Sequence, residues 1–200
     1  MRFIVLLVLL LGGASFAQPF APKVMRITGT VERVDGDDVT IRAIEGGGTN
    51  IVHLAKNAVV FGIARATLAD VKPGAFIGVG ATPKPDGSQR AIRVTVFSEQ
   101  QRGRGEGFRP WGRAPHGTMT NATVDETVKG VDGQVVTVKY SGGEKRIVIP
   151  PDARILAYSP GARSEIKPGA EVAISRAVRK LDGTWEADRI NVGRGGLIPD

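Results

Sequence analysis

The chain contains no cysteine, so it can form neither a disulfide framework nor a thiolate metal site. Histidine occurs only at His53 and His116, too few for a zinc site without help from scattered carboxylates. The chain also lacks a G-x-S-x-G nucleophile elbow and a glycine-rich phosphate loop placed between a strand and a helix. These absences predict a protein without catalytic residues, cofactor or metal, and therefore not an enzyme.

Long apolar runs are almost as scarce. The one clear example is Phe3–Leu11, which follows Arg2 and precedes the small-residue sequence Ser15-Phe16-Ala17. This layout is typical of a secretory signal, with cleavage after Ala17. The run is too short for a membrane anchor, which needs about 20 apolar residues. We therefore predict a leader at 1–17, a periplasmic or secreted protein, and no membrane-spanning segment.

Acidic residues are fewer than basic ones, with 20 Asp and Glu against 27 Lys and Arg, giving a net charge of +7. An exported protein of this charge is attracted to anionic surfaces, although a merely solvated basic surface is the alternative. The carboxylates do not single out a catalytic pair. The acidic stretch Asp35–Asp38 lacks the spacing and the distal glutamate of a calcium loop, so we interpret it as a hairpin turn.

The strongest positive signal is an internal repeat. The stretch "DVKPGAFIGVG" at 70–80 reappears as "EIKPGAEVAIS" at 165–175, and three further landmarks recur in the same order at offsets of 95 to 97 residues. The repeat predicts two domains at 27–97 and 121–193. They are flanked by an arm at 18–26, a linker at 98–120 and a tail at 194–200.

Within each copy, apolar residues alternate with polar ones, as in strands that bury one face. Examples are Val39 and Ile41 in the first copy, and Val136 and Val138 in the second. Asp-Gly and Gly-Gly pairs between the runs favour hairpin turns. Each copy therefore predicts three strands, a short helical turn and two more strands. We expect an all-β protein of two tandem five-stranded OB-like barrels, with an SH3-like barrel or a pair of sandwiches as alternatives.

The repeated Lys-Pro-Gly-Ala motif predicts a type II turn in each copy. Proline presets φ at the second position, and Gly74 or Gly169 supplies the positive φ at the third. The turn would return the chain to a strand at a fixed angle, so valine at either glycine should cost a few kcal/mol.

The stretches "GTVERVDGDDVTI", "LADVKPGAFIGV" and "DGSQRAIRV" resemble an exported bacterial repeat family catalogued as domain of unknown function 5666. The resemblance covers 27–97 well and 122–192 less well. It implies the fold and export, but the family has no established chemistry to carry over.

The linker is rich in arginine and glycine and shows no strand or helix period, which predicts an extended, mobile segment. Its arginines and aromatics are the candidate binding residues, against the alternative of a solvated spacer: Arg102, Arg104, Phe108, Arg109, Trp111 and Arg113. The predicted strands offer no aromatic platform for bases, and export makes nucleic acid an unsuitable partner.

These observations predict an exported, non-enzymatic binding or scaffolding protein of the cell envelope, whose partner is an envelope protein or an anionic surface polymer. The alternative is an accessory protein, possibly serving a transport system, that binds a small anion or a metal between its two barrels.

Overall fold

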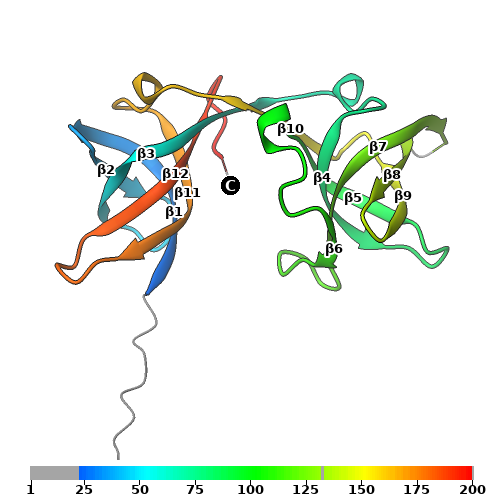
Figure 1. Ribbon diagram of the computed structural model, residues 1–200, viewed down its shortest axis with the longest axis horizontal. Helices are drawn as coiled ribbons and strands as arrows, with labels where there is room; N and C mark the ends of the chain where they lie inside the picture. Colours follow the sequence, from blue (N-terminus) through cyan, green and yellow to red (C-terminus); the bar gives the residue numbers. More distant parts are fainter. Residues whose placement is uncertain (1–22, 132, 200) are drawn as a thin grey trace, which may run out of the picture.

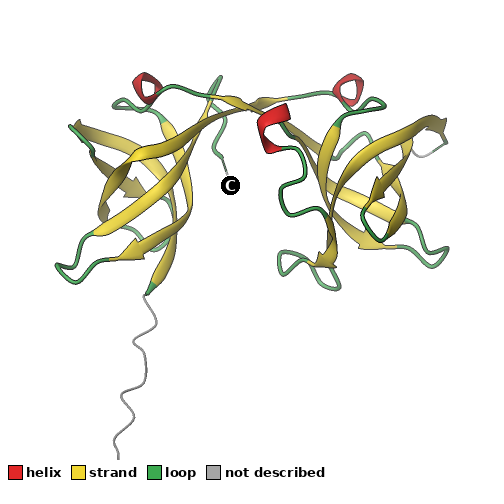
Figure 2. Ribbon diagram, in the orientation of Figure 1, coloured by secondary structure: helices red, strands yellow, loops and turns green. Residues whose placement is uncertain are grey.

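The protein is all-β, with a closed five-stranded barrel and further strands, in a computed structural model that describes residues 23–131 and 133–199 (Figures 1 and 2). The predicted leader and most of the predicted arm lie outside the described residues. The first strand begins at Val24, three residues before the predicted domain boundary.

The elements of the first repeat follow the predicted order. They are β1 (Val24–Asp35), β2 (Asp38–Ala43), β3 (Thr49–Arg65), the 3-10 turn η1 (Leu68–Asp70), β4 (Phe76–Pro83) and β5 (Gln89–Val96). The alternation in β2 is confirmed, because Val39 and Ile41 are buried whereas Arg42 is exposed.

The second repeat contains the same elements with one interruption. They are β7 (Thr118–Gly130), β8 (Gly133–Tyr140), β9 (Gly143–Ile149), β10 (Arg154–Pro160), η3 (Arg163–Glu165), β11 (Glu171–Arg179) and β12 (Trp185–Gly193). Together β9 and β10 correspond to the single long strand β3. Pro150 and Pro151 separate them, because proline has no N–H to donate to a strand ladder.

Strand pairing closes a first ring from both repeats. β1 pairs with β2, β2 with β3, β3 with β12, β12 with β11, and β11 returns to β1. The closing β3–β12 contact is parallel and runs from Val52 opposite Trp185 to Ile63 opposite Gly193. The ring encloses an apolar core that includes Ile41 and Ile174.

A second ring closes in the same way. β7 pairs with β8, β8 with β9, β9 with β5, β5 with β4, and β4 returns to β7. The parallel pairing of β5 with β9 that closes this ring is short: Gln89 lies opposite Ile147, and Arg90 lies opposite Val148. Farther along β5, β10 takes the place of β9 and also pairs in parallel. A separate apolar core containing Ile77 and Ile147 fills this ring.

These pairings correct the predicted division of the chain into consecutive barrels at 27–97 and 121–193. β4 and β5 of the first repeat complete the ring of the second repeat, and β11 and β12 complete the ring of the first. The exchange occurs because β3 and β10 continue past their own rings and cross one another (Figure 1). The two stretches contain similar successions of strands, and these strands are shared between the rings.

The crossing of β3 and β10 lies on an approximate two-fold axis. The two strands pair antiparallel from Phe61 opposite Pro160 to Arg65 opposite Leu156. The central pair joins Ile63 to Tyr158, which are equivalent residues of the two repeats. Ile63, Leu156 and Leu197 form a small buried cluster at this point, so the predicted C-terminal tail packs against the crossing.

Each Lys-Pro-Gly-Ala turn docks on the first strand of the ring that it enters. Gly74 and Gly169 both have φ of 84°, and their N–H groups donate to the carbonyl oxygens of Val124 and Val31 at 2.8 and 2.9 Å. In the first copy the Ala75 N–H donates to the Lys72 carbonyl at 3.0 Å and closes the turn. The turns therefore direct β4 and β11 into the exchanged positions.

Valine at Gly74 or Gly169 is expected to destabilise the protein through backbone strain. A Cβ atom at either glycine has no neighbour within 4 Å, so the positive φ is the only penalty, and we expect about 1–3 kcal/mol. Chemical denaturation measures the loss. Gly112→Val is the matched control, because a Cβ there also meets open space and no positive φ is required. Equal unfolding midpoints for Gly74→Val and Gly112→Val would contradict this account.

The segment predicted as a mobile linker is ordered and contains a strand, β6 (Gly107–Pro110), and a 3-10 turn, η2 (Glu99–Gln101). β6 pairs with the start of β7. The segment connects β5 to β7, both of which belong to the second ring, so it does not link two barrels. Gln101 is buried, and the Asn121 side-chain amide donates to the Arg104 carbonyl at 3.1 Å. The prediction of a mobile linker relied on the absence of an apolar period. The segment is held instead by polar contacts, which leave no such period.

Candidate functional site

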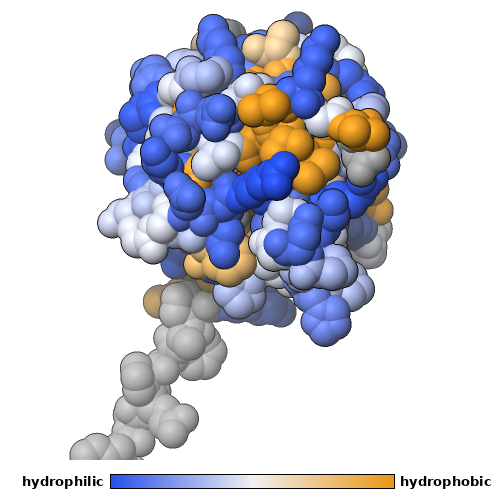
Figure 3. Space-filling model, turned by 90° about the vertical axis from the view of Figure 1, so that its right-hand side faces the viewer, coloured by the Kyte–Doolittle hydropathy of each residue, from blue (hydrophilic) through white to orange (hydrophobic). Residues whose placement is uncertain are grey.

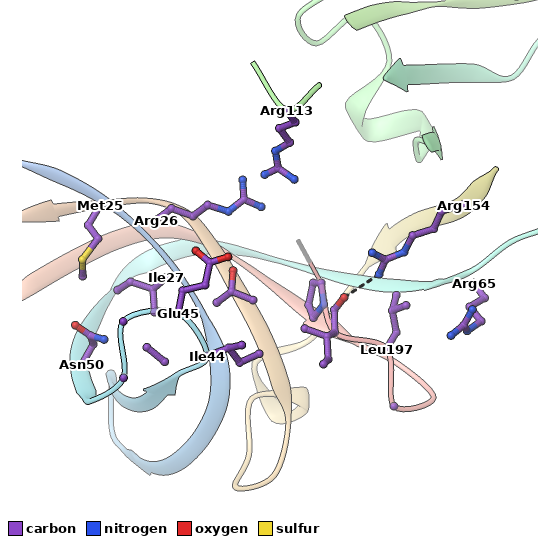
Figure 4. A pocket seen from close by; sticks show the side chains of 17 residues that line it. Met25, Arg26, Ile27, Ile44, Glu45, Asn50, Arg65, Arg113, Arg154 and Leu197 are labelled. Atoms are coloured by element: carbon purple, nitrogen blue, oxygen red, sulfur yellow. Dashed lines mark hydrogen bonds between the residues drawn. The ribbon is translucent and has the colours of Figure 1, made fainter. Parts of the chain in front are cut away.

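An open cleft of about 1100 Å³ lies between the two rings, beside the crossing of β3 and β10 (Figure 4). One wall comes from the first ring: the start of β1, the β2–β3 loop and the C-terminal tail. The opposite side receives residues from the 98–117 segment and from the start of β10. The cleft therefore exists only because the strand exchange holds the two rings side by side.

Four arginines reach this cleft from separate segments. Arg26 lies on β1, Arg65 ends β3, Arg113 belongs to the 98–117 segment and Arg154 begins β10. Figure 4 shows the guanidinium groups of Arg26 and Arg113 reaching toward one another from opposite sides. Glu45 is the only acidic residue among the described residues that line the cleft. This concentration of fixed positive charge in a concave site attracts anions.

The wall that carries Arg26 also contains apolar residues. Ile44 is 53% exposed and Ile198 is 46% exposed, although both are large aliphatic residues. Figure 4 shows Ile44 below Arg26 with the Glu45 side chain between them, and Leu197 near Arg154 and Arg65. The Arg154 guanidinium donates to the Ile198 carbonyl at 3.0 Å and thereby holds the tail in the cleft wall. The cleft thus combines guanidinium groups with exposed aliphatic side chains.

No family model, curated protein or solved structure matches the chain. The arrangement of the cleft residues is therefore the basis for assigning a function to this protein.

Of the six binding residues predicted from the sequence, only Arg113 lines the cleft. Arg102 is engaged within the fold: it makes two 2.7 Å contacts with the Glu99 carboxylate and donates to the Gly74 carbonyl at 2.9 Å. The Glu99 hydrogen bond raises the pKa of Arg102 and lowers that of Glu99. Arg102 therefore braces the turn at Gly74.

The two aromatics of the segment are also used locally. Trp111 packs over Gly80, where a Cβ atom would overlap its ring, and the Arg93 guanidinium lies 6.0 Å from the ring centroid. Phe108 on β6 is 42% exposed and has the Lys145 ammonium 4.6 Å from its ring centroid. These contacts attach the segment to the second ring.

Arg104 precedes Gly105 in the loop before β6, and Arg109 lies on β6. The Arg109 guanidinium donates to the Gly105 carbonyl at 2.7 Å. Arg189 on β12 is half-buried over the Phe61 ring, and desolvation, with the positive charge of Arg104, lowers its pKa. The structure thus distributes the predicted residues over several places instead of forming one binding surface.

Arg26, Arg65 and Arg154 were not predicted as binding residues. Each is an ordinary polar position in or beside a strand, and no short motif joins them. They meet only because β3 and β10 cross and because the first ring accepts strands from both repeats. A signal for this cluster requires the three-dimensional pairing, which the repeat pattern does not contain.

The outer faces of the two rings differ at equivalent positions. In the first ring Asp35, Asp38, His53 and Glu186 lie opposite one another across four strands, and the His53 ring contacts the Asp38 carboxylate at 2.8 Å. The corresponding row of the second ring is Val128, Val135, Val148 and Arg90. Figure 3 shows apolar side chains gathered on this side of the second ring.

The acidic row of the first ring does not form a metal centre. Among residues 23–131 and 133–199, no group of three or more His, Asp or Glu side chains is arranged to hold a metal ion. Within the same residues, no helix has the length and apolar character needed to cross a bilayer.

Proposed function

We propose that this protein is an exported, non-enzymatic binding protein that holds an anionic ligand in the cleft between its two rings. The observation that carries the proposal is the convergence of Arg26 and Arg113 from opposite sides of the cleft, together with Arg65 and Arg154. Guanidinium groups suit this role because their planar donors match carboxylate and phosphate oxygens in pairs.

The electrostatics of the whole chain favour the same ligand class. The net charge of +7 draws anions toward the protein, and the concave cleft concentrates that attraction where the arginines stand. Binding of an anion in this cleft should therefore weaken as salt is added.

Each ring is proposed to be an OB-like barrel, and the chain to belong to the exported repeat family that its motifs resemble. The strand order supports the barrel assignment: within each ring the first, second, third, fifth and fourth strand types are neighbours, and the third and fifth run parallel. The cell envelope is the proposed location, on the strength of the sequence 1–17.

A scaffolding role through the 98–117 segment is the second proposal carried from the sequence. It is less well supported, because Arg102, Arg109 and Trp111 already have partners within the fold. An envelope protein or an anionic surface polymer remains a suitable partner if its anionic groups enter the arginine cleft.

Thermal unfolding with a panel of anions tests the proposed function. Multivalent anions such as pyrophosphate should raise the melting temperature. At a concentration of 100 times Kd, the expected gain in unfolding free energy is about 2.7 kcal/mol. Arg26→Ala and Arg113→Ala should each remove most of the shift. Arg90→Ala is the matched control, because Arg90 is exposed on the second ring away from the cleft.

Two outcomes would overturn the assignment. Equal shifts in the wild type, Arg26→Ala and Arg113→Ala would place anion binding elsewhere on the surface. A shift with divalent cations and none with anions would favour the metal-binding alternative over the anion-binding function.

A further inference from the structure

We propose that the ligand of the arginine cleft is an anionic amphiphile, with a charged head and a single alkyl chain. This inference rests on the proposed function and names the ligand class for the same site. Its basis is the presence of guanidinium groups and exposed aliphatic side chains in one cleft (Figure 4).

Two aliphatic side chains of the cleft are unusually open to water. Ile44 and Ile198 keep 53% and 46% of their surface exposed, and they lie in one concave site with Met25 and Pro199. Scattered apolar residues on a convex surface need no explanation, but apolar residues gathered in a cleft beside convergent charges are typical of ligand sites. An inorganic anion would contact the arginines and leave these isoleucines in water.

The dimensions of the cleft fit such a ligand. Its volume of about 1100 Å³ is slightly above the range of small-molecule pockets, about 300–1,000 Å³, so there is room for both a head group and an alkyl chain. The head group would lie between Arg26 and Arg113, and the chain would cover Ile44 and Ile198. Each methylene that leaves water on this surface adds to the affinity, so binding should strengthen with chain length.

Calorimetric titration of the purified protein with decyl phosphate, inorganic phosphate and decanol tests the inference, with the amphiphile kept below its micelle concentration. Decyl phosphate should bind at least tenfold more tightly than phosphate, and decanol should bind more weakly than decyl phosphate. Fatty acids of equal chain length extend the test to carboxylate heads and distinguish the two sources of negative charge.

Variants separate the contribution of the arginines from that of the isoleucines. Ile44→Ser and Ile198→Ser should each weaken decyl phosphate binding about tenfold and leave phosphate binding unchanged. Arg26→Ala should weaken both ligands. Ile92→Ser is the matched control, because Ile92 is a 44% exposed isoleucine outside the cleft and its loss should change neither affinity. Half-exposed isoleucines contribute little to the core, so these variants should fold.

The outcomes distinguish the inference from the function beneath it. Equal affinities for phosphate and decyl phosphate, both reduced by Arg26→Ala, would overturn the amphiphile but support anion binding. Absence of binding by every anion would overturn both. Decyl phosphate binding that is the same in the wild type, Arg26→Ala and Ile44→Ser would show detergent-like adsorption and would also overturn the inference.

Discussion

Cutting the chain within the 98–117 segment is expected to leave two fragments that stay together as one folded particle. The fragment before the cut carries β1–β5, and the fragment after it carries β7–β12. Because each ring contains strands from both fragments, separation would require opening both rings and exposing both apolar cores. Two consecutive barrels, in contrast, would separate after a single cut in their linker.

A protease site inserted at Gly103–Gly105 makes this experiment specific, because these residues are exposed and lie between η2 and β6. Size-exclusion chromatography with light scattering should give the mass of the uncut protein after complete cleavage. The same sample in denaturant should give two separate fragments, which controls for incomplete cutting. Separate, folded fragments in native buffer would show that each repeat closes its own ring.

Removal of the partly exposed Arg194 is expected to cause a large loss of stability. Its guanidinium makes contacts of 2.8 and 2.9 Å with the Glu165 carboxylate and donates to the Ser159 hydroxyl at 2.6 Å. It also covers Gly62, where a Cβ atom would overlap it. We expect Arg194→Ala to cost about 2–4 kcal/mol, because a bidentate ion pair and a hydrogen bond to β10 disappear together.

Urea denaturation measures this loss, and Gly62→Ala provides a second route to it by displacing the same guanidinium. Glu186→Gln is the matched control: it breaks an ion pair with Lys180 whose two side chains are 40% and 47% exposed. Such solvated pairs contribute little. Equal losses for Arg194→Ala and Glu186→Gln would contradict a special role for Arg194.

The same contact predicts a pH dependence. Hydrogen bonds from Arg194 and from the Ala162 N–H lower the pKa of Glu165 from 4.5 to about 2. Because the folded pKa lies below the unfolded one, the stabilisation is complete above pH 4.5 and is lost as the pH falls toward 2. Since the pair is partly solvated, we expect a loss of about 1–2 kcal/mol across this window. Glu165→Gln should remove this component from the pH profile of unfolding, whereas an unchanged profile would refute it.

The repeat and its strands could be predicted from the sequence because both depend on local patterns. Alternation at Val39 and Ile41 marks a half-buried strand wherever the strand is placed, and Gly74 requires a positive φ in any arrangement. The sequence does not determine which strand each strand pairs with. Gly74 donates to Val124 and Gly169 donates to Val31, and both acceptors are valines at the same place in their repeats. An exchanged and an unexchanged pairing therefore satisfy the sequence equally well.

The 98–117 segment and the cleft were harder to predict for related reasons. The segment is held by polar contacts, such as the Asn121 side chain to the Arg104 carbonyl, and such contacts leave no hydrophobic period. The cleft combines Arg26, near the start of the described chain, with Arg113 and Arg154. Only the tertiary arrangement makes these residues neighbours, so composition alone indicated a basic protein without locating its basic site.

Because the chain emerges from its amino end, the strand exchange also determines the order in which the two rings can close. The strands of the second ring are consecutive, from Phe76 to Ile149, so this ring can close while later residues are still being made. The first ring must wait with β1–β3 unclosed until Trp185–Gly193 arrive and supply its final strand. A chain that ends before β12 would therefore leave the apolar residues around Ile27 uncovered, and we expect proteases to cleave it faster than the full-length protein.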